Sequence, residues 1–325
     1  MKNNVRTDLA LEAREYYKEK NNEEIDGVEV EEYIDKQVIV SHVKVLNDNG
    51  EKLLGKPKGN YITLEFADFV YYDSEAKEDV SKTLAKELSK IIKIDENSKA
   101  LIVGLGNWNI TPDALGPKVT SKLMITRHLR EYIPDKIDEG IIPVSAIAPG
   151  VLGITGIETS EIVKGIVDKT KPTLVICIDA LASRKTQRVN KTIQIGNTGI
   201  SPGAGIGNKR MELSEETLGV PVIAIGVPTV VDAATLASDT IDLVIDDLME
   251  AAEETGEFYR MLKALSEGER ETLIKEVLGQ KLSSLVVTPK DIDMVINAIS
   301  NIIANGINIA LQPALTLKDI NKYIN

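Results

Sequence analysis

Residues 173–180 read TLVICIDA, a short run of apolar and β-branched side chains that ends in a carboxylate. A second run of this kind, residues 100–107 (ALIVGLGN), is followed by Asp113 within residues 111–117 (TPDALGP). Such runs predict buried strands. In an open parallel sheet, ligands bind in the crevice beyond the carboxyl ends of the strands. Asp113 and Asp179 are therefore expected to converge on one crevice, where two carboxylates can share a proton for acid/base catalysis or hold a metal ion.

The rest of the chain predicts an α/β fold. From about residue 79 onward, segments with a helical spacing of apolar residues alternate with short apolar strands. This alternation indicates a mostly parallel or mixed sheet flanked by helices. Residues 28–70 differ, because β-branched residues and a turn signal at residues 48–50 (DNG) predict a smaller antiparallel β element near the N-terminus. Residues 251–280 are charged and helix-prone, and they predict a helical excursion from the core.

Three helices have boundaries that bear on the candidate site. Residues 8–20 predict a helix for which Asp8 is the N-cap. Residues 114–132 predict one continuous helix, which places His128 inside a helix. Residues 291–304 predict the last helix of the chain.

The composition bounds the function. The 325 residues are enough for one large core, and the net charge of -12 is unfavourable for binding a phosphate backbone, so we expect no direct nucleic-acid partner. The single cysteine, Cys177, excludes an internal disulfide and is expected to be a buried small hydrophobe. Residues 1–8 lack the apolar region of a secretory signal, and no run approaches the roughly 20 apolar residues of a membrane helix. We therefore expect a cytoplasmic protein with no membrane partner.

Two glycine-rich segments invite a nucleotide-binding interpretation, namely residues 104–106 (GLG) and 203–207 (GAGIG). Neither completes the G-x-G-x-x-G pattern and the chain has no Walker motif, so no nucleotide cofactor is expected. The glycines instead predict sharp bends or close approaches of the backbone. With only His42 and His128 in the chain, a His-rich metal site and a Ser-His-Asp triad are also disfavoured.

Each aspartate also has a purely structural explanation. Asp113 could cap the helix that follows it, and Asp179 could be a turn residue. Asp232 ends a third apolar run within residues 228–233 (PTVVDA); helix capping is its favoured role, and an auxiliary role in catalysis is the alternative. Three acidic residues after three predicted strands form a stronger signal than any one of them alone.

Taken together, these stretches resemble the germination protease of spore-forming bacteria, an endopeptidase that degrades small acid-soluble spore proteins. The resemblance runs in order from residue 5 to about residue 310. It is carried by residues 5–13 (VRTDLALEA), 104–107 (GLGN), 111–118 (TPDALGPK), 125–129 (ITRHL), 149–151 (PGV), 155–159 (TGIET), 178–184 (IDALASR), 205–210 (GIGNKR) and 228–233 (PTVVDA).

The resemblance implies an endopeptidase whose fold is similar to that of hydrogenase maturation proteases. It implies that Asp113 and Asp179 are the catalytic pair and that the enzyme is a homotetramer of the developing spore and spore core. Apolar faces near residues 230–248 and 295–311 agree with subunit association, since they exceed what one sheet face needs. In the related maturation proteases the matching acidic positions bind a metal with help from a histidine. No histidine suits that role here, so we expect neither an essential metal nor a cofactor.

The resemblance also implies that the chain is made as an inactive zymogen. Residues 1–8 would be the pro-segment, and residues 9–325 would form a single α/β peptidase domain. Family substrates are cut after Glu, before Ile or Phe followed by Ala, with another acid nearby. Asp8, Leu9 and the residues up to Glu12 repeat that order, which predicts self-cleavage between Asp8 and Leu9. The structural alternative is that residues 1–8 are a frayed terminus.

Two other functions compete with an aspartate-dependent endopeptidase. The first is a metal-dependent, maturation-type peptidase in which Asp113 and Asp179 are ligands. The second is a non-catalytic binding protein of the same fold. Resistance of the activity to chelators separates the aspartate-dependent endopeptidase from the metal-dependent peptidase. The absence of any proteolysis would favour the non-catalytic binding protein. The donors that would stabilise an oxyanion are expected to be backbone amides of the glycine-rich loops.

Overall fold

The computed structural model of the chain describes residues 7–324 apart from residues 134, 136, 139, 204–209, 252–255, 257–259 and 261–284. The predicted helical excursion over residues 251–280 lies almost entirely outside these described residues. The same holds for most of the glycine-rich segment 203–207 and for residues 1–6 of the proposed pro-segment.

The described part of the chain forms one mixed sheet of nine strands, which confirms the predicted α/β class. Strands β8, β6, β4 and β5 are parallel neighbours, whereas β1, β2, β3 and β7 are antiparallel neighbours that join the sheet where β7 pairs with β8. The short strand β9 pairs with the far end of β8. The strands, in their spatial order, are β1 Val28–Asp35, β2 Val38–Val45, β3 Gly59–Glu65, β7 Thr192–Gly196, β8 Val222–Asp232, β6 Leu174–Ser183, β4 Ala100–Gly104 and β5 Val144–Ile147, with β9 at Val286–Val287.

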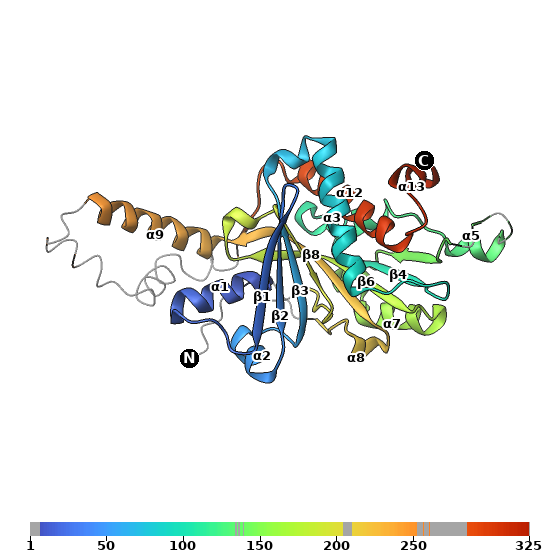
Figure 1. The fold of residues 1–325 in the computed structure, drawn as a ribbon, viewed down its shortest axis with the longest axis horizontal. Helices are drawn as coiled ribbons and strands as arrows, with labels where there is room; N and C mark the ends of the chain where they lie inside the picture. The colour runs from blue at the N-terminus through green and yellow to red at the C-terminus, as the bar shows by residue number, and fades with distance from the viewer. Residues whose placement is uncertain are drawn as a thin grey trace.

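Helices cover both faces of the parallel half (Figure 1). On one face, α3 and α12 pack beside each other over alternate residues of the strands, such as Ile176 and Ile178 of β6. On the other face, α7 and α8 cover the intervening residues, among them Val175 and Cys177. Cys177 is fully buried, as predicted, and burial raises the pKa of its thiol. These helices are α3 Ser74–Ile91, α4 Leu115–Thr120, α7 Thr159–Thr170, α8 Glu215–Leu218 and α12 Ile292–Leu311.

The remaining helices lie outside these two layers. Figure 1 shows α9 reaching away from the sheet and α1 lying near the antiparallel strands. Helix α1 contributes Ala10 and Leu11 to a small apolar cluster with β2 and β3. These helices are α1 Ala10–Asn21, α2 Asp48–Leu54, α5 Arg127–Tyr132, α6 Leu152–Thr155, α9 Ala233–Ala251 and α13 Leu317–Ile324.

The predicted helix over residues 114–132 is wrong, because the chain forms two helices, α4 and α5, with an extended link between them. The link makes hydrogen bonds to other segments of the chain instead of helical hydrogen bonds. Thr126 Oγ1 donates to the carbonyl of Ile142 at 2.6 Å and accepts from the amide of Val144 at 2.9 Å. The amide of Met124 donates to the Asn308 side chain at 3.0 Å. These partners tie the link to β5 and α12.

Two other boundaries differ from the prediction. The DNG segment opens α2 rather than a tight turn, because the Asn47 side chain accepts from the amide of Gly50 and caps a short helix. The helix predicted over residues 291–304, α12, continues to Leu311 and is not the last of the chain, because α13 follows it. Among the described residues, α12 is the one helix long and apolar enough to cross a membrane, but 72% of its most apolar window is buried inside the protein, as in a core helix.

Candidate active site

Asp179 lies inside β6, not at its end as predicted. β6 runs on to Ser183 because β8 continues to pair with it, and Asp179 stands opposite Gly226 of β8. On the other side, pairing with β4 stops at Gly104, which stands opposite Ile178. Asp179 is therefore the first residue of β6 beyond the end of its neighbour, at the opening of the crevice, and it is only 5% exposed.

Asp113 is returned toward the same crevice by a tight loop after β4. Gly106 has a φ of +109°, and a Cβ there would lie 2.0 Å from the Asp113 carbonyl oxygen. The amide of Asn107 donates to that carbonyl at 3.0 Å. Thr111–Asp113 then forms one turn of 3₁₀ helix with a proline near its start. Asp113 is not a helix cap, because the N-cap of α4 is Ala114 and makes no side-chain bond.

A close contact brings the start of α4 onto the ends of the two central strands. A Cβ on Gly116 would lie 2.3 Å from the carbonyl oxygen of Leu105 and 2.6 Å from that of Ile178. Only glycine, which has no Cβ, allows the two backbones to come this close. Gly116 lies three residues after Asp113 in TPDALGP, so this contact holds Asp113 next to the segment that carries Asp179. The predicted convergence of the two aspartates rests on this contact.

The pKa values of both carboxyl groups are raised. Burial raises the pKa of Asp179 well above its usual range, and the negative charge of Asp113 raises it further. The hydrogen bond from the Ala180 amide, 2.9 Å from Asp179 Oδ1, opposes this rise. Burial likewise raises the pKa of Asp113 to about 6, against a hydrogen bond from the backbone of Asn107. Near neutral pH, the arrangement favours one proton on Asp179 and a charge on Asp113.

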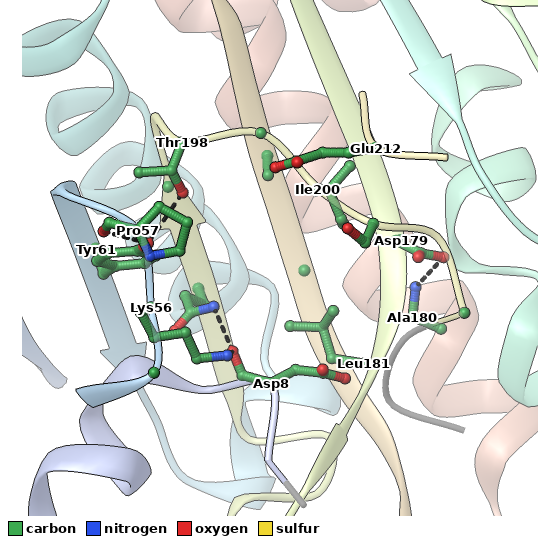
Figure 2. Close-up of a pocket in the computed structure, with 18 residues that line it drawn as sticks. Asp8, Lys56, Pro57, Tyr61, Asp179, Ala180, Leu181, Thr198, Ile200 and Glu212 are labelled. Carbon is green, nitrogen blue, oxygen red and sulfur yellow. Dashed lines mark hydrogen bonds between the residues drawn. The ribbon is translucent and has the colours of Figure 1, made fainter. Parts of the chain in front are cut away.

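A cavity of ≈ 330 Å³ opens beside Asp179 (Figure 2). Its other walls come from β8, from the loop after β7 and from the antiparallel half of the sheet. The sequence did not connect this last part with function. Lys56 belongs to the loop between α2 and β3, Tyr61 to β3 and Gln194 to β7. Nothing in the sequence around Lys56 or Gln194 marked them, because neither lies in a recognisable motif and their partners are distant in the chain.

The N-terminal segment enters this cavity. The carboxylate of Asp8 accepts a hydrogen bond from the amide of Ala182 at 3.0 Å, and the Asp8 amide donates to the Ala182 carbonyl at 3.2 Å. The predicted capping role is therefore wrong: the N-cap of α1 is Leu9, and Asp8 binds β6 instead. Leu9 is fully buried, so this end of the chain is not frayed at residue 8. The charge of Asp8 also contributes to the raised pKa of Asp179.

Glu12 fixes the start of α1 nearby. Its carboxylate is 2% exposed and accepts from the amides of Arg184 at 2.7 Å and Lys185 at 2.9 Å. Arg188 lies beneath it and pairs with Glu15 at 2.7 Å. The segment from Asp8 to Glu12 is thus held along the end of β6 by backbone amides.

Other candidate residues lie elsewhere. Asp232 closes β8 opposite Val286 and is not among the described residues that line the cavity. His42 on β2 bonds to the buried Glu87 at 2.8 Å, and His128 lies in α5. Within the described ranges, no three His, Cys, Asp or Glu side chains are grouped so that they could hold a metal ion.

The fold and the site define an α/β protein in which the buried Asp179, at a strand-end crevice, feels the charge of Asp113 and lines a cavity together with Asp8 of the N-terminal segment. A family model described as germination protease matches residues 5–262 and 246–324 of the chain. The chain belongs to the germination protease family, and it is accordingly a peptidase, a hydrolase of peptide bonds.

Individual relatives agree over nearly the whole length. The chain is 64% identical to the germination protease of Clostridium tetani over 321 residues, 99% of each protein. It is 60% identical to that of Clostridium acetobutylicum over 326 residues, 99% of this chain and 100% of the relative. It is 46% identical to that of Bacillus licheniformis over 355 residues, 98% of this chain and 96% of the relative.

Proposed function

We propose that the chain is an endopeptidase that begins the degradation of small acid-soluble spore proteins during germination, with Asp113 and Asp179 as a proton-sharing pair. The observation that carries the proposal is the effect of the Asp113 charge on the buried Asp179, which lines a cavity that Asp8 of the N-terminal segment also lines. The family membership favours an enzyme over a non-catalytic binding protein.

The electrostatics suggest a division of labour. Two carboxylates about 4 Å apart at an effective dielectric of about 20 repel by roughly 4 kcal/mol, enough to keep one of them protonated near neutral pH. Asp179 is the more deeply buried and holds the proton, which it donates to the scissile carbonyl or the leaving amine. Asp113, with a pKa of about 6, is ionised near neutral pH and activates the attacking water.

The direct test is incubation of the purified protein with candidate spore proteins, followed by mass spectrometry of the fragments. Wild-type protein should cut after an acidic residue, and Asp113→Asn and Asp179→Asn should give no fragments at matched concentration. Fragments from either variant at the wild-type rate would refute the paired-aspartate mechanism.

A metal-dependent peptidase with the same two aspartates as ligands is the competing mechanism. It predicts that EDTA or phenanthroline abolishes cleavage and that one specific metal restores it. The paired-aspartate mechanism predicts that cleavage survives prolonged chelation.

We further propose that the chain is a zymogen that cuts itself between Asp8 and Leu9. The support is that Asp8 lines the cavity of Asp179 and that the carbonyls of Thr7 and Asp8 accept hydrogen bonds from Lys56. The Asp8 carbonyl faces Lys56 in this arrangement, so cleavage requires the segment to shift or to reach a neighbouring subunit. A protein that starts at Leu9 should cleave without a lag, and Asp8→Lys should stay uncut. Full-length protein with an intact N-terminus and full activity would contradict the zymogen proposal.

A homotetramer in the cytoplasm of the developing spore and the spore core completes the proposal. The exposed apolar surface that could support subunit association is smaller than predicted, because the apolar face of α12 is buried within the chain. Helix α9, in contrast, exposes Leu243 and Val244, at 66% and 51%. Light scattering should give four times the chain mass for wild type and a smaller species for Leu243→Asp. A wild-type monomer at micromolar concentration would contradict the assembly.

A further inference from the structure

Asp8, which lines the cavity, and its neighbours are bound from two sides. On one side, the Asp8 amide donates to the carbonyl of Ala182 in β6, and the Ala182 amide donates to the Asp8 carboxylate, so one of the two contacts uses the Asp8 side chain. On the other side, Lys56 reaches toward Asp8 from the loop before β3 (Figure 2). Gln194 of β7 bonds to the same segment. The segment therefore lies in a slot between the two halves.

Gln194 reads only the backbone of the segment. Its Oε1 accepts from the amide of Ala10 at 2.7 Å, and its Nε2 donates to the carbonyl of Asp8 at 3.1 Å. The two contacts flank Leu9 and use peptide groups alone. A side-chain amide that bonds the peptide groups on both sides of one residue makes the same pair of contacts as a neighbouring β-strand. Such contacts do not depend on the side chains of the bound segment.

Lys56 binds two consecutive carbonyl groups. Its Nζ donates to the carbonyl of Asp8 at 2.9 Å and to that of Thr7 at 3.3 Å. Lys56 is the one cation among the described residues that line this cavity, which also holds the carboxylates of Asp8, Asp179 and Glu212. Burial lowers the pKa of Lys56, and the charges of Asp8 and Glu12 oppose that change.

We propose that Lys56 and Gln194 form the seat for the backbone of the substrate, and that residues 7 and 8 of the chain occupy this seat before a substrate does. The proposal rests on the proposed peptidase function. It assigns the contacts that hold the substrate backbone to side chains of the antiparallel half.

The groups that accept hydrogen bonds from Lys56 distinguish a role in substrate binding from a role in stabilising the fold. A lysine that stabilises the fold would bond to groups that stay in place. Here the acceptors of the ammonium are carbonyls of residues 7 and 8, which self-cleavage would remove. The departure of these residues leaves an enclosed ammonium without those acceptors, and an unmade buried bond is costly. The carbonyl groups of a substrate peptide can restore them.

Hydrogen exchange measured on the full-length chain tests the seat without any need for activity. The Asp179→Asn background keeps the segment uncut, and Lys56→Met and Gln194→Leu are compared in it with Lys58→Met. Lys58 is a matched control. It lies two residues from Lys56, is half exposed and pairs with the exposed Asp48. We expect both seat variants to speed exchange of the segment that contains Ala10 by at least about tenfold, with the control unchanged. Unchanged exchange in both seat variants overturns the proposal.

Peptide cleavage after self-processing tests the role toward substrate. Lys56→Met should raise KM by about tenfold or more and leave kcat within about threefold, because uniform binding is lost. An unchanged KM overturns the proposal even if exchange responds. If wild-type protein cleaves nothing, the peptidase function itself has failed, and the exchange experiment still decides whether Lys56 and Gln194 hold the segment.

Discussion

The parallel and the antiparallel halves of the sheet contribute opposite chemistry to one cavity. The parallel half supplies Asp179 to the cavity, and the loop after β4 carries Asp113, which is not among the described lining residues but whose charge acts on Asp179. The antiparallel half supplies Lys56, Tyr61 and Gln194, which donate hydrogen bonds. A purely parallel sheet would offer the acids at its strand ends but no wall opposite them. The added strands create that wall, so Asp179 faces a cavity and not open solvent.

Burial acts on both halves in the same physical sense. It raises the pKa of Asp179 and Asp113 and lowers the pKa of Lys56, because it disfavours every charged form. The consequence differs, however. For the acids, the shift sets up a shared proton. For the lysine, the nearby charges of Asp8 and Glu12 work against the shift.

The largest effect should come from the acids of the parallel half. Asp179→Asn and Asp113→Asn should each lower kcat/KM by at least about a thousandfold, because each removes one member of a unit. The free energy of unfolding of Asp179→Asn should not fall, since an amide removes a buried ionisable group. Asp232→Asn is the control, and its activity should stay within a few-fold of wild type. A strong loss of activity in Asp232→Asn would give Asp232 an auxiliary role in catalysis.

The next effect tests the contact that brings the two acids together. Gly116→Ala should lower the free energy of unfolding by about 3 kcal/mol or more, because the new Cβ meets two backbone oxygens that cannot move aside easily. Gly165→Ala in α7 is the matched control. No atom lies within 4 Å of its added Cβ, so it should stabilise the helix by about 0.5–1 kcal/mol. Chemical denaturation of both variants gives the comparison.

A smaller effect concerns pH. The pKa of Asp113 is about 6 in the folded protein, above its ordinary value of 3.8, so the folded state binds the proton more tightly than the unfolded state. Stability from this group is complete below about pH 4 and is lost as the pH rises through 6. Wild type should lose of the order of 1–2 kcal/mol over this range relative to Asp113→Asn, after allowance for solvent screening. Parallel pH dependences of the two proteins would contradict the raised pKa.

The smallest effect falls on the antiparallel half. The Tyr61 hydroxyl donates to the carbonyl of Pro57 at 2.8 Å and accepts from Thr198 at 3.1 Å, which steadies the loop that carries Lys56. Tyr61→Phe should therefore cost about 1 kcal/mol of unfolding free energy. Tyr132→Phe, at a position 81% exposed, should cost nothing measurable by denaturation. A larger loss at Tyr132 than at Tyr61 would contradict the assigned contacts.

The sequence predicted the parallel half well because its signals are local. A run such as residues 173–180 carries its own strand propensity and ends in its own acid. The strand beyond Asp179 was missed because its continuation depends on β8, a partner that lies more than 40 residues away. The break between α4 and α5 was missed for the same reason, since Asn308 and Ile142 supply the partners.

The cavity residues of the antiparallel half could not be predicted from the sequence. Gln194 acts by bridging to Asp8 and Ala10, which lie more than 180 residues away, and no spacing encodes such a contact. The role of Asp8 was mistaken because an acid before a helix usually caps it. Here the amide of Ala182 offers a better-placed donor.

The pH dependence of kcat/KM for peptide cleavage tests the pairing of Asp113 and Asp179 most directly. Paired acids that share one proton predict a bell-shaped profile, whose ascending limb follows the ionisation of Asp113 near a pKa of about 6. The descending limb follows the loss of the proton from Asp179. A rate that is constant from about pH 4 to pH 8, or an ascending limb at the ordinary pKa of an exposed aspartate, would contradict a shared proton between the two.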